Sequence, residues 1–294
     1  MATEVGRPIV PRIVHVQRRL TETPLARQHE HALATRSAPR RHAPIAWDRF
    51  DRRAYPEPAL ALAANANRAL AGGEYGAIDV FARLASALAL NGAPFDLVAV
   101  AARIPADEIR HADYAVRLAS LCEGRDVTFS IDRNNFETRW ERPIDLEELD
   151  DLMVEIPTIG ETLAGAFLTA CQRRAADPVA KAVFSAIVSD EVHHARLGWY
   201  YLVWRAPQWS TAQRQRVANR AGALIAGTEA LYWRGRDAPA NAAPAAAALG
   251  VLDTPAQQNV LNRVMEEEIL PGLDALGLGA SHAWRGRPRL VGAA

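Results

Sequence analysis

The sequence has almost no lysine and almost no cysteine, and both shortages narrow what the chain can do. Lys181 is the only lysine among 34 basic residues, and 34 acidic residues balance them to a formal net charge of zero. The whole chain therefore lacks the excess positive charge with which proteins bind polyanions. Cys122 and Cys171 stand alone and form neither a zinc-binding pattern nor a disulfide framework. We expect a reducing, cytoplasmic environment.

Long apolar runs are also missing. No stretch reaches the roughly 18 apolar residues that a membrane-spanning helix needs, and the first residues show no signal-peptide pattern. The apolar run of residues 60–70 is interrupted by Asn65, Asn67 and Arg68. We therefore expect no membrane span. Hydrophobic residues still make up 49% of the 294 residues, which is enough for a substantial core.

A five-residue pattern that occurs twice is the most informative feature of the sequence. Residues 107–111 and 190–194 both read D-E-x-x-H. Residues three apart on an α-helix lie on one face, about one turn from each other. The Glu and the His of each copy can therefore reach one metal ion together; these residues are Glu108, His111, Glu191 and His194.

Each motif has a glutamate at a suitable distance upstream. Glu74 precedes Glu108 by 34 residues and Glu161 precedes Glu191 by 30, intervals that suit a helix, a short turn and an antiparallel helix. All four glutamates lie in stripes of apolar residues at helical spacing, where a carboxylate is costly to bury unless it is paired or metal-bound. Glycines beside Glu74 and Glu161 would let helices approach closely. A single E-x-x-H is usually a solvated helix face, but a duplicated motif with upstream glutamates favours a dimetal site.

Neighbouring residues predict a second layer of contacts. Asp107 and Asp190 could each accept the other ring N–H of the histidine in the opposite motif, giving two crossed Asp–His pairs; the alternative is a surface salt bridge. Arg110 of the first motif corresponds to His193 of the second. His193 could replace the salt bridge of that arginine or act as an additional ligand. We favour the former, because adjacent helical positions diverge by about 100°.

Over about residues 60–205 the sequence resembles the ferritin-like di-iron carboxylate superfamily. The similarity is strongest to its oxygen-activating branch, in which D-E-x-R-H motifs recur: the bacterial multicomponent monooxygenases, the ribonucleotide reductase small subunits and the p-aminobenzoate N-oxygenase type. The resemblance implies a dinuclear iron site, with Mn/Fe or Mn/Mn as variants. The ligands that it implies are Glu74, Glu108, His111, Glu161, Glu191 and His194.

The sequence departs from this pattern at two positions. The N-oxygenase type has an additional His one turn before the second motif Glu, where this chain has Ile187. In the reductase subunits a radical Tyr follows the first motif His by four residues, where this chain has Ala115, with Tyr114 one position away. We therefore expect neither a seventh ligand nor a stored tyrosyl radical.

The expected fold is all-α: a ferritin-like four-helix bundle with a crossover connection, an N-terminal arm and additional C-terminal helices. The N-terminal residues 1–45 hold eight Arg and four His against three acids and read as a basic extended arm. Residues 46–236 would form the bundle, and residues 237–294 an Ala/Pro linker with helices that cover one side of it. The predicted helices span roughly 57–91, 95–123 with a kink at Pro105, 146–175 with a break or kink at Pro157, 177–204 capped by Asp177, 210–234 and 255–269; residues 127–131 are strand-like.

A carboxylate-rich site with two histidines suits hard, redox-active ions better than zinc, whose single sites use three or four N or S ligands. The expected protein is a non-haem dinuclear iron oxidase or oxygenase that uses O₂ to oxidise a small organic substrate, for example in specialised metabolism. It would need an electron donor or reductase, and it could be a homodimer. The alternatives are an iron-handling ferroxidase, an RNA-modifying di-iron hydroxylase whose basic arm binds RNA, and a bundle that the metal only stabilises.

Aromatic residues cluster near the second motif. They could line a pocket or carry electrons; the alternative is core packing with an exposed rim. These residues are Trp199, Tyr200, Tyr201 and Trp204, with Tyr75 and Tyr114 near the expected ligands.

Overall fold

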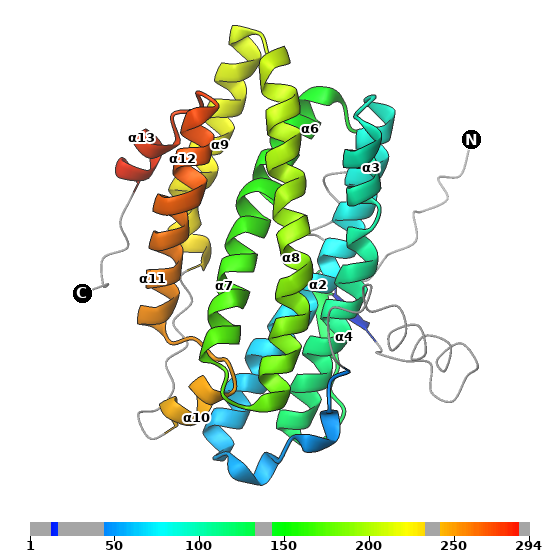
Figure 1. Cartoon of the computed structure of the whole chain (residues 1–294), viewed down its shortest axis with the longest axis vertical. Helices are drawn as coiled ribbons and strands as arrows, with labels where there is room; N and C mark the ends of the chain where they lie inside the picture. The colour runs from blue at the N-terminus through cyan, green and yellow to red at the C-terminus, as the bar shows by residue number, and fades with distance from the viewer. Residues whose placement is uncertain (1–12, 17–43, 133–142, 233–241, 288–294) are drawn as a thin grey trace, which may run out of the picture.

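Most of the described chain is helical. The structure, a computed structural model, describes residues 13–16, 44–132, 143–232 and 242–287 (Figure 1). Within these ranges the strands are β1 (Ile13–Val16) and β2 (Phe129–Asp132), which pair antiparallel with Ile13 opposite Asp132. The predicted all-α class is confirmed. The described helices include none with the length and hydrophobicity needed to cross a bilayer.

Two pairs of neighbouring helices carry the glutamates and the motifs. In the first pair, α2 (Glu57–Leu90) lies beside α4 (Ile104–Glu123); in the second, α7 (Glu161–Arg174) lies beside α8 (Pro178–Arg205) (Figure 1). The N-terminal end of α8 is fixed as the sequence predicted: Oδ1 of Asp177 accepts hydrogen bonds from the amides of residues 179 and 180 at 2.9 and 2.8 Å. Such a cap satisfies amides that have no partner within the helix.

The helix predicted over 95–123 is two helices. It divides into α3 (Phe95–Ala101) and α4, with the break at residues 102–103. The prediction of a kink at Pro105 was therefore wrong. Pro105 lies in the first turn of α4, where its missing N–H would have had no helical partner in any case.

Pro157 disturbs the helix that leads to Glu161, as predicted. The helix α6 (Leu146–Met153) passes into a π-helical segment, η4 (Val154–Gly160), and then into α7. In an α-helix the amide of residue 157 would bond to the carbonyl of Met153, but proline has no N–H. The hydroxyl of Thr158 donates to that carbonyl instead, at 2.7 Å. The π segment thus follows from one proline and ends at a predicted ligand.

Further helices cover the α7 side of the molecule, in agreement with the prediction (Figure 1). The helix α9 (Thr211–Tyr232) precedes them, and α11 (Thr254–Val264) continues through the π segment η6 (Met265–Ile269) into α12 (Leu270–Ala275), followed by α13 (Ala280–Arg285). The predicted Ala/Pro linker contains a short helix, α10 (Ala243–Ala248), which suits its alanines.

Parts of the predicted arm and crossover lie outside the described residues. Of residues 1–45, the structure describes 13–16 and 44–45; of the link between α4 and α6, it does not describe 133–142. Short 3-10 turns, η2 (Trp47–Arg49) and η3 (Arg52–Ala54), lead into α2, and η5 (Ala206–Gln208) follows α8. The strand-like character predicted for residues 127–131 agrees with β2.

Two apolar clusters lie on either side of the D-E-x-x-H motif along α8. Along α8, Phe184 and Ile187 belong to one cluster, while Leu197 and Tyr201 belong to the other. Glu191 and His194 lie between them along the helix. Glu191 and His194 are thus surrounded by packed hydrophobic side chains that exclude water.

Candidate metal centre

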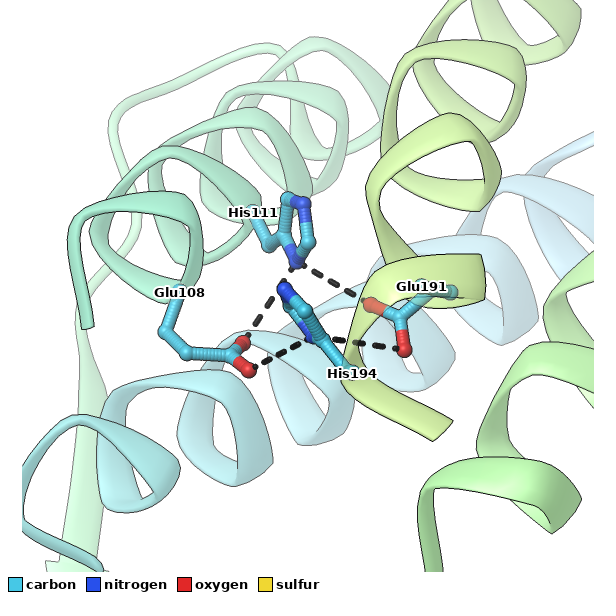
Figure 2. A group of neighbouring side chains, drawn as sticks. All are labelled: Glu108, His111, Glu191 and His194. Carbon is cyan, nitrogen blue, oxygen red and sulfur yellow. Dashed lines mark ion pairs between the residues drawn. The ribbon is translucent and has the colours of Figure 1, made fainter. Parts of the chain in front are cut away.

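The two D-E-x-x-H motifs face each other across α4 and α8. Glu108 and His111 project from α4, and Glu191 and His194 from α8, into one group (Figure 2). One ligand atom from each of these four residues lies within 4.8 Å of the others, and all four side chains are buried. The sequence prediction that both motifs contribute to one centre agrees with this geometry.

Each motif glutamate spans both histidines. Glu108 places Oε2 at 3.4 Å from Nδ1 of His111 and Oε1 at 3.1 Å from Nδ1 of His194. Glu191 does the same, with Oε1 at 3.2 Å from His111 and Oε2 at 3.7 Å from His194 (Figure 2). The simple expectation that each motif would serve its own ion is therefore incomplete, because both carboxylates lie between the two imidazoles.

The upstream glutamates lie on the outer sides of the group, one beside each histidine. Oε2 of Glu74 on α2 is 3.9 Å from Nδ1 of His111, and Oε2 of Glu161 on α7 is 3.7 Å from Nδ1 of His194. Their side chains are 11% and 13% exposed. All six predicted ligand residues thus meet at one place, and each histidine has one outer glutamate of its own.

Five buried atoms at the centre of this group have no hydrogen-bond partner. They are Nδ1 of both histidines, Oε2 of Glu108 and both carboxylate oxygens of Glu191. A buried polar atom without a partner costs roughly 1–3 kcal/mol, and a charged one more. Bound cations would satisfy these atoms together, because every one of them is a potential metal ligand. The residues present therefore fit a metal centre.

The opposite ring nitrogen of each histidine faces an aspartate of the other motif, in the crossed arrangement predicted. Nε2 of His111 is 3.4 Å from Oδ2 of Asp190, and Nε2 of His194 is 3.5 Å from Oδ2 of Asp107. If Nε2 donates its hydrogen to the aspartate, Nδ1 keeps the lone pair that a metal requires. The aspartates therefore orient the imidazoles toward the centre.

Arg110 and His193, which occupy equivalent motif positions, have different environments. Arg110 is buried, and its Nη2 donates to Oδ1 of Asp107 at 2.5 Å and to Oδ2 of Asp190 at 2.7 Å. His193 is exposed, and no ion pair links it to another described residue. The structure supports neither of the two interpretations of His193, as a substitute for the arginine or as an additional ligand.

The electrostatics of the group favour positive charge. Burial alone would lower the pKa of His194, but the neighbouring carboxylates of Asp107 and Glu108 raise it to about 12. Burial raises the pKa of Glu161 to about 8. Burial, aided by repulsion from Glu108, also raises the pKa of Glu74 well above its ordinary value. These groups retain protons because several carboxylates share a dry space, and divalent cations would displace those protons.

The glycine that permits close helix packing is Gly198, four residues after His194. A Cβ at this position would collide with the backbone nitrogen and hydroxyl of Thr158 in the π segment. Among the glycines near the upstream glutamates, Gly73 has open space around it, whereas Gly165 lies against α8, where an added Cβ would make an ordinary contact with Glu191. Gly198 is recognisable in the sequence as a one-turn neighbour of His194.

Most of the aromatic residues near α8 have structural contacts. The hydroxyl of Tyr201 donates to the buried carboxylate of Asp150 at 2.7 Å, and Nε1 of Trp199 donates to the hydroxyl of Thr162 at 3.1 Å. Tyr200 is exposed. Core packing with an exposed rim therefore describes this run better than a pocket lining. Sequence inspection missed Asp150, since an aspartate in an acidic helix start resembles an exposed residue.

The positions where the sequence departs from the ferritin-like pattern lie in the apolar core or at its edge. Ile187 and Ala115 are buried. Tyr114 is half-buried, with its ring 6.0 Å from that of Trp47.

Comparison with known proteins adds nothing to this geometry, since no protein-family model, curated protein or solved structure matches the chain.

Proposed function

We propose that this protein is a ferritin-like dinuclear iron protein that uses O₂ to oxidise a small organic substrate. The observation that carries the proposal is the set of five ligand atoms that make no hydrogen bond and are buried between two motifs of identical spacing. Four helices supply a glutamate each and two of them add a histidine, which is the donor set of di-iron and di-manganese carboxylate bundles. A reduced iron pair supplies the electrons that O₂ needs.

Charge balance supports two divalent ions rather than one. Four glutamates bring four negative charges, and histidines that donate to aspartates through Nε2 are neutral. Two divalent cations neutralise that total, whereas one would leave two negative charges in a dry environment, which is costly. The arrangement of oxygens agrees with this count. Glu108 and Glu191, which each face both histidines, and Glu74 and Glu161, which each face one, would hold the ions.

The other residues of the centre hold these ligands in place and keep bulk water out. Asp107 and Asp190 fix the orientation of the two imidazoles, which keeps Nδ1 directed inward. Phe81, which is fully buried, places its ring 6.0 Å from that of His194. Such a dry enclosure prevents loss of reactive oxygen species to water. The buried position also distinguishes this centre from an exposed acidic cluster.

Iron loading followed by exposure to O₂ tests the proposal. Full-length protein would be loaded anaerobically with Fe(II), desalted and assayed for bound iron and for O₂ uptake with a chemical reductant. We expect two irons per chain and a transient visible absorption when O₂ is added. His194→Ala should abolish both. His282→Ala is the matched control, because His282 is exposed and lies far from the centre on α13.

Two of the alternatives, iron handling and a purely stabilising metal, have their own outcomes in this experiment. Growth of an iron mineral beyond two ions per chain would replace the proposal with iron handling. Two ions that do not react with O₂ would indicate a metal that only stabilises the fold. No bound iron, or the same iron content in His194→Ala as in wild type, would refute the assignment of the centre.

A further inference from the structure

A single nitrogen atom joins the two Asp–His pairs. Nη2 of Arg110 donates to Oδ1 of Asp107 and to Oδ2 of Asp190, and the same Oδ2 of Asp190 faces Nε2 of His111. The other oxygen of Asp107 faces Nε2 of His194. The contacts form one continuous chain from the first histidine to the second, in the order His111, Asp190, Arg110, Asp107, His194.

This chain connects the two halves of the centre from outside. His111 is next to Glu74, and His194 is next to Glu161, so the two histidines would bind different ions. Asp107 and Asp190 carry like charges on facing helices, and each raises the energy of the other when both are ionised. Arg110, which is buried between them, offsets that repulsion. Without its charge the two aspartates would move apart and release at least one imidazole.

We infer that Arg110 is a positioning residue that couples the loading of the two metal positions; the inference rests on the proposed dimetal centre. With an ion bound at Nδ1 of His111, that ring and its contact with Asp190 would be fixed in orientation. The shared Nη2 then holds Asp107 in place, which orients His194 for the second ion. The coupling works in both directions, because linkage between two binding events is reciprocal.

The second motif offers no substitute for this arginine. The corresponding residue, His193, is exposed and makes no ion pair with the described residues. Both aspartates depend on Arg110, which belongs to one motif only. The asymmetry predicts that one substitution, which removes no ligand, lowers the coupling between the two metal positions.

Stepwise Mn(II) binding under argon tests the inference. Free Mn(II) is counted from its six-line electron paramagnetic resonance signal during titration of the full-length chain. Wild type should bind two ions. In Arg110→Gln the first ion should bind nearly as in wild type, and the second about tenfold or more weakly, within the usual range of coupling between sites. Arg110→Lys should retain most of the coupling, because one nitrogen atom makes both contacts and an ammonium can replace it.

Arg205→Gln is the matched control. Arg205 is buried on the same helix as His194, and its Nε is 3.1 Å from Oδ1 of Asp150, but it lies eleven residues beyond the histidine. That is about 16 Å along the helix axis. Its loss should lower the melting temperature and leave the ratio of the two Mn(II) constants unchanged. If Arg110 had only a structural role, Arg110→Gln would give this same result: a lower melting temperature and an unchanged ratio.

The outcomes separate the inference from the proposed function. Wild type that binds fewer than two Mn(II) ions would refute the dimetal centre itself. Two ions in wild type with an unchanged ratio in Arg110→Gln would refute the coupling alone, as would an equal change in Arg205→Gln. If Arg110→Gln does not fold, Asp107→Asn interrupts the same chain at its more exposed member, 24% accessible, and must weaken the second ion.

Discussion

Replacing Glu108 with glutamine should weaken both metal positions, whereas replacing Glu74 should weaken one. Glu108 presents one oxygen to each histidine, at 3.4 Å from Nδ1 of His111 and 3.1 Å from Nδ1 of His194. Glu74 makes its ion pair with His111. Glutamine keeps the shape of glutamate and removes its charge. The number of weakened positions therefore reports how many ions each carboxylate contacts.

The size of the effect follows from Coulomb's law. Two unit charges about 4 Å apart attract by roughly 4 kcal/mol at an effective dielectric constant of about 20. That energy corresponds to about a thousandfold in a dissociation constant. Both stepwise constants should rise by at least this factor in Glu108→Gln. In Glu74→Gln one constant should rise and the other should change by less than about tenfold.

Competition between the protein and a fluorescent chelator for Co(II) measures both constants. Glu57→Gln is the control, because Glu57 lies on the same helix as Glu74 but is exposed and pairs with Arg52 at the surface. It should bind Co(II) like wild type. Loss of one equivalent in Glu108→Gln with the other unchanged would show that each motif serves its own ion. If the Glu74 and Glu108 variants weakened the same number of Co(II) constants, the conclusion that Glu108 serves both ions and Glu74 only one would also be refuted.

Gly198→Ala should destabilise the protein by about 1–3 kcal/mol and weaken metal binding, because the added methyl collides with Thr158; an unchanged thermal melt would contradict this. Metal-free protein should lose stability as the pH rises from about 6 to 9. Glu161 and His194 have raised pKa values of about 8 and about 12, so the folded chain binds more protons than the unfolded chain, by up to about 1.4 kcal/mol per pH unit and proton. Melting curves at several pH values test that sign, and a rise in stability would refute it. Asp150→Ala should cost about 3–5 kcal/mol in urea denaturation, since two buried donors lose their acceptor and buried Arg205 loses its ion-pair partner; a loss below about 1 kcal/mol would exclude this role.

Local signals in the sequence predicted most of the helices and the four motif residues that lie together in one buried group. The spacing of Glu108 from His111, and of Glu191 from His194, is a property of one helical turn and needs no tertiary information. Asp177 predicted the start of α8 because a cap acts on the next residues of the chain. Pro157 predicted the disturbance before Glu161 for the same reason, since a missing N–H acts within one turn.

Predictions that depend on neighbouring helices were less accurate. Gly198 was not singled out from the sequence, although the contact that excludes a side chain lies between this residue and Thr158. His193 was assigned a partner, but its side of α8 faces solvent. Both errors concern which residue of another helix lies opposite, and a single helix carries no such information.

The sequence by itself determined that this protein is helical and that two Glu-x-x-His turns, each with an upstream glutamate, are available for metal binding. Only the tertiary structure decided that each motif glutamate spans both histidines and that one guanidinium joins both aspartates. The physical reason is the distance along the chain over which each interaction acts. Helical spacing arises from bonds within four residues, whereas the sharing of a carboxylate or a cation depends on the distance and rotation between α4 and α8, which the packing of the whole core sets.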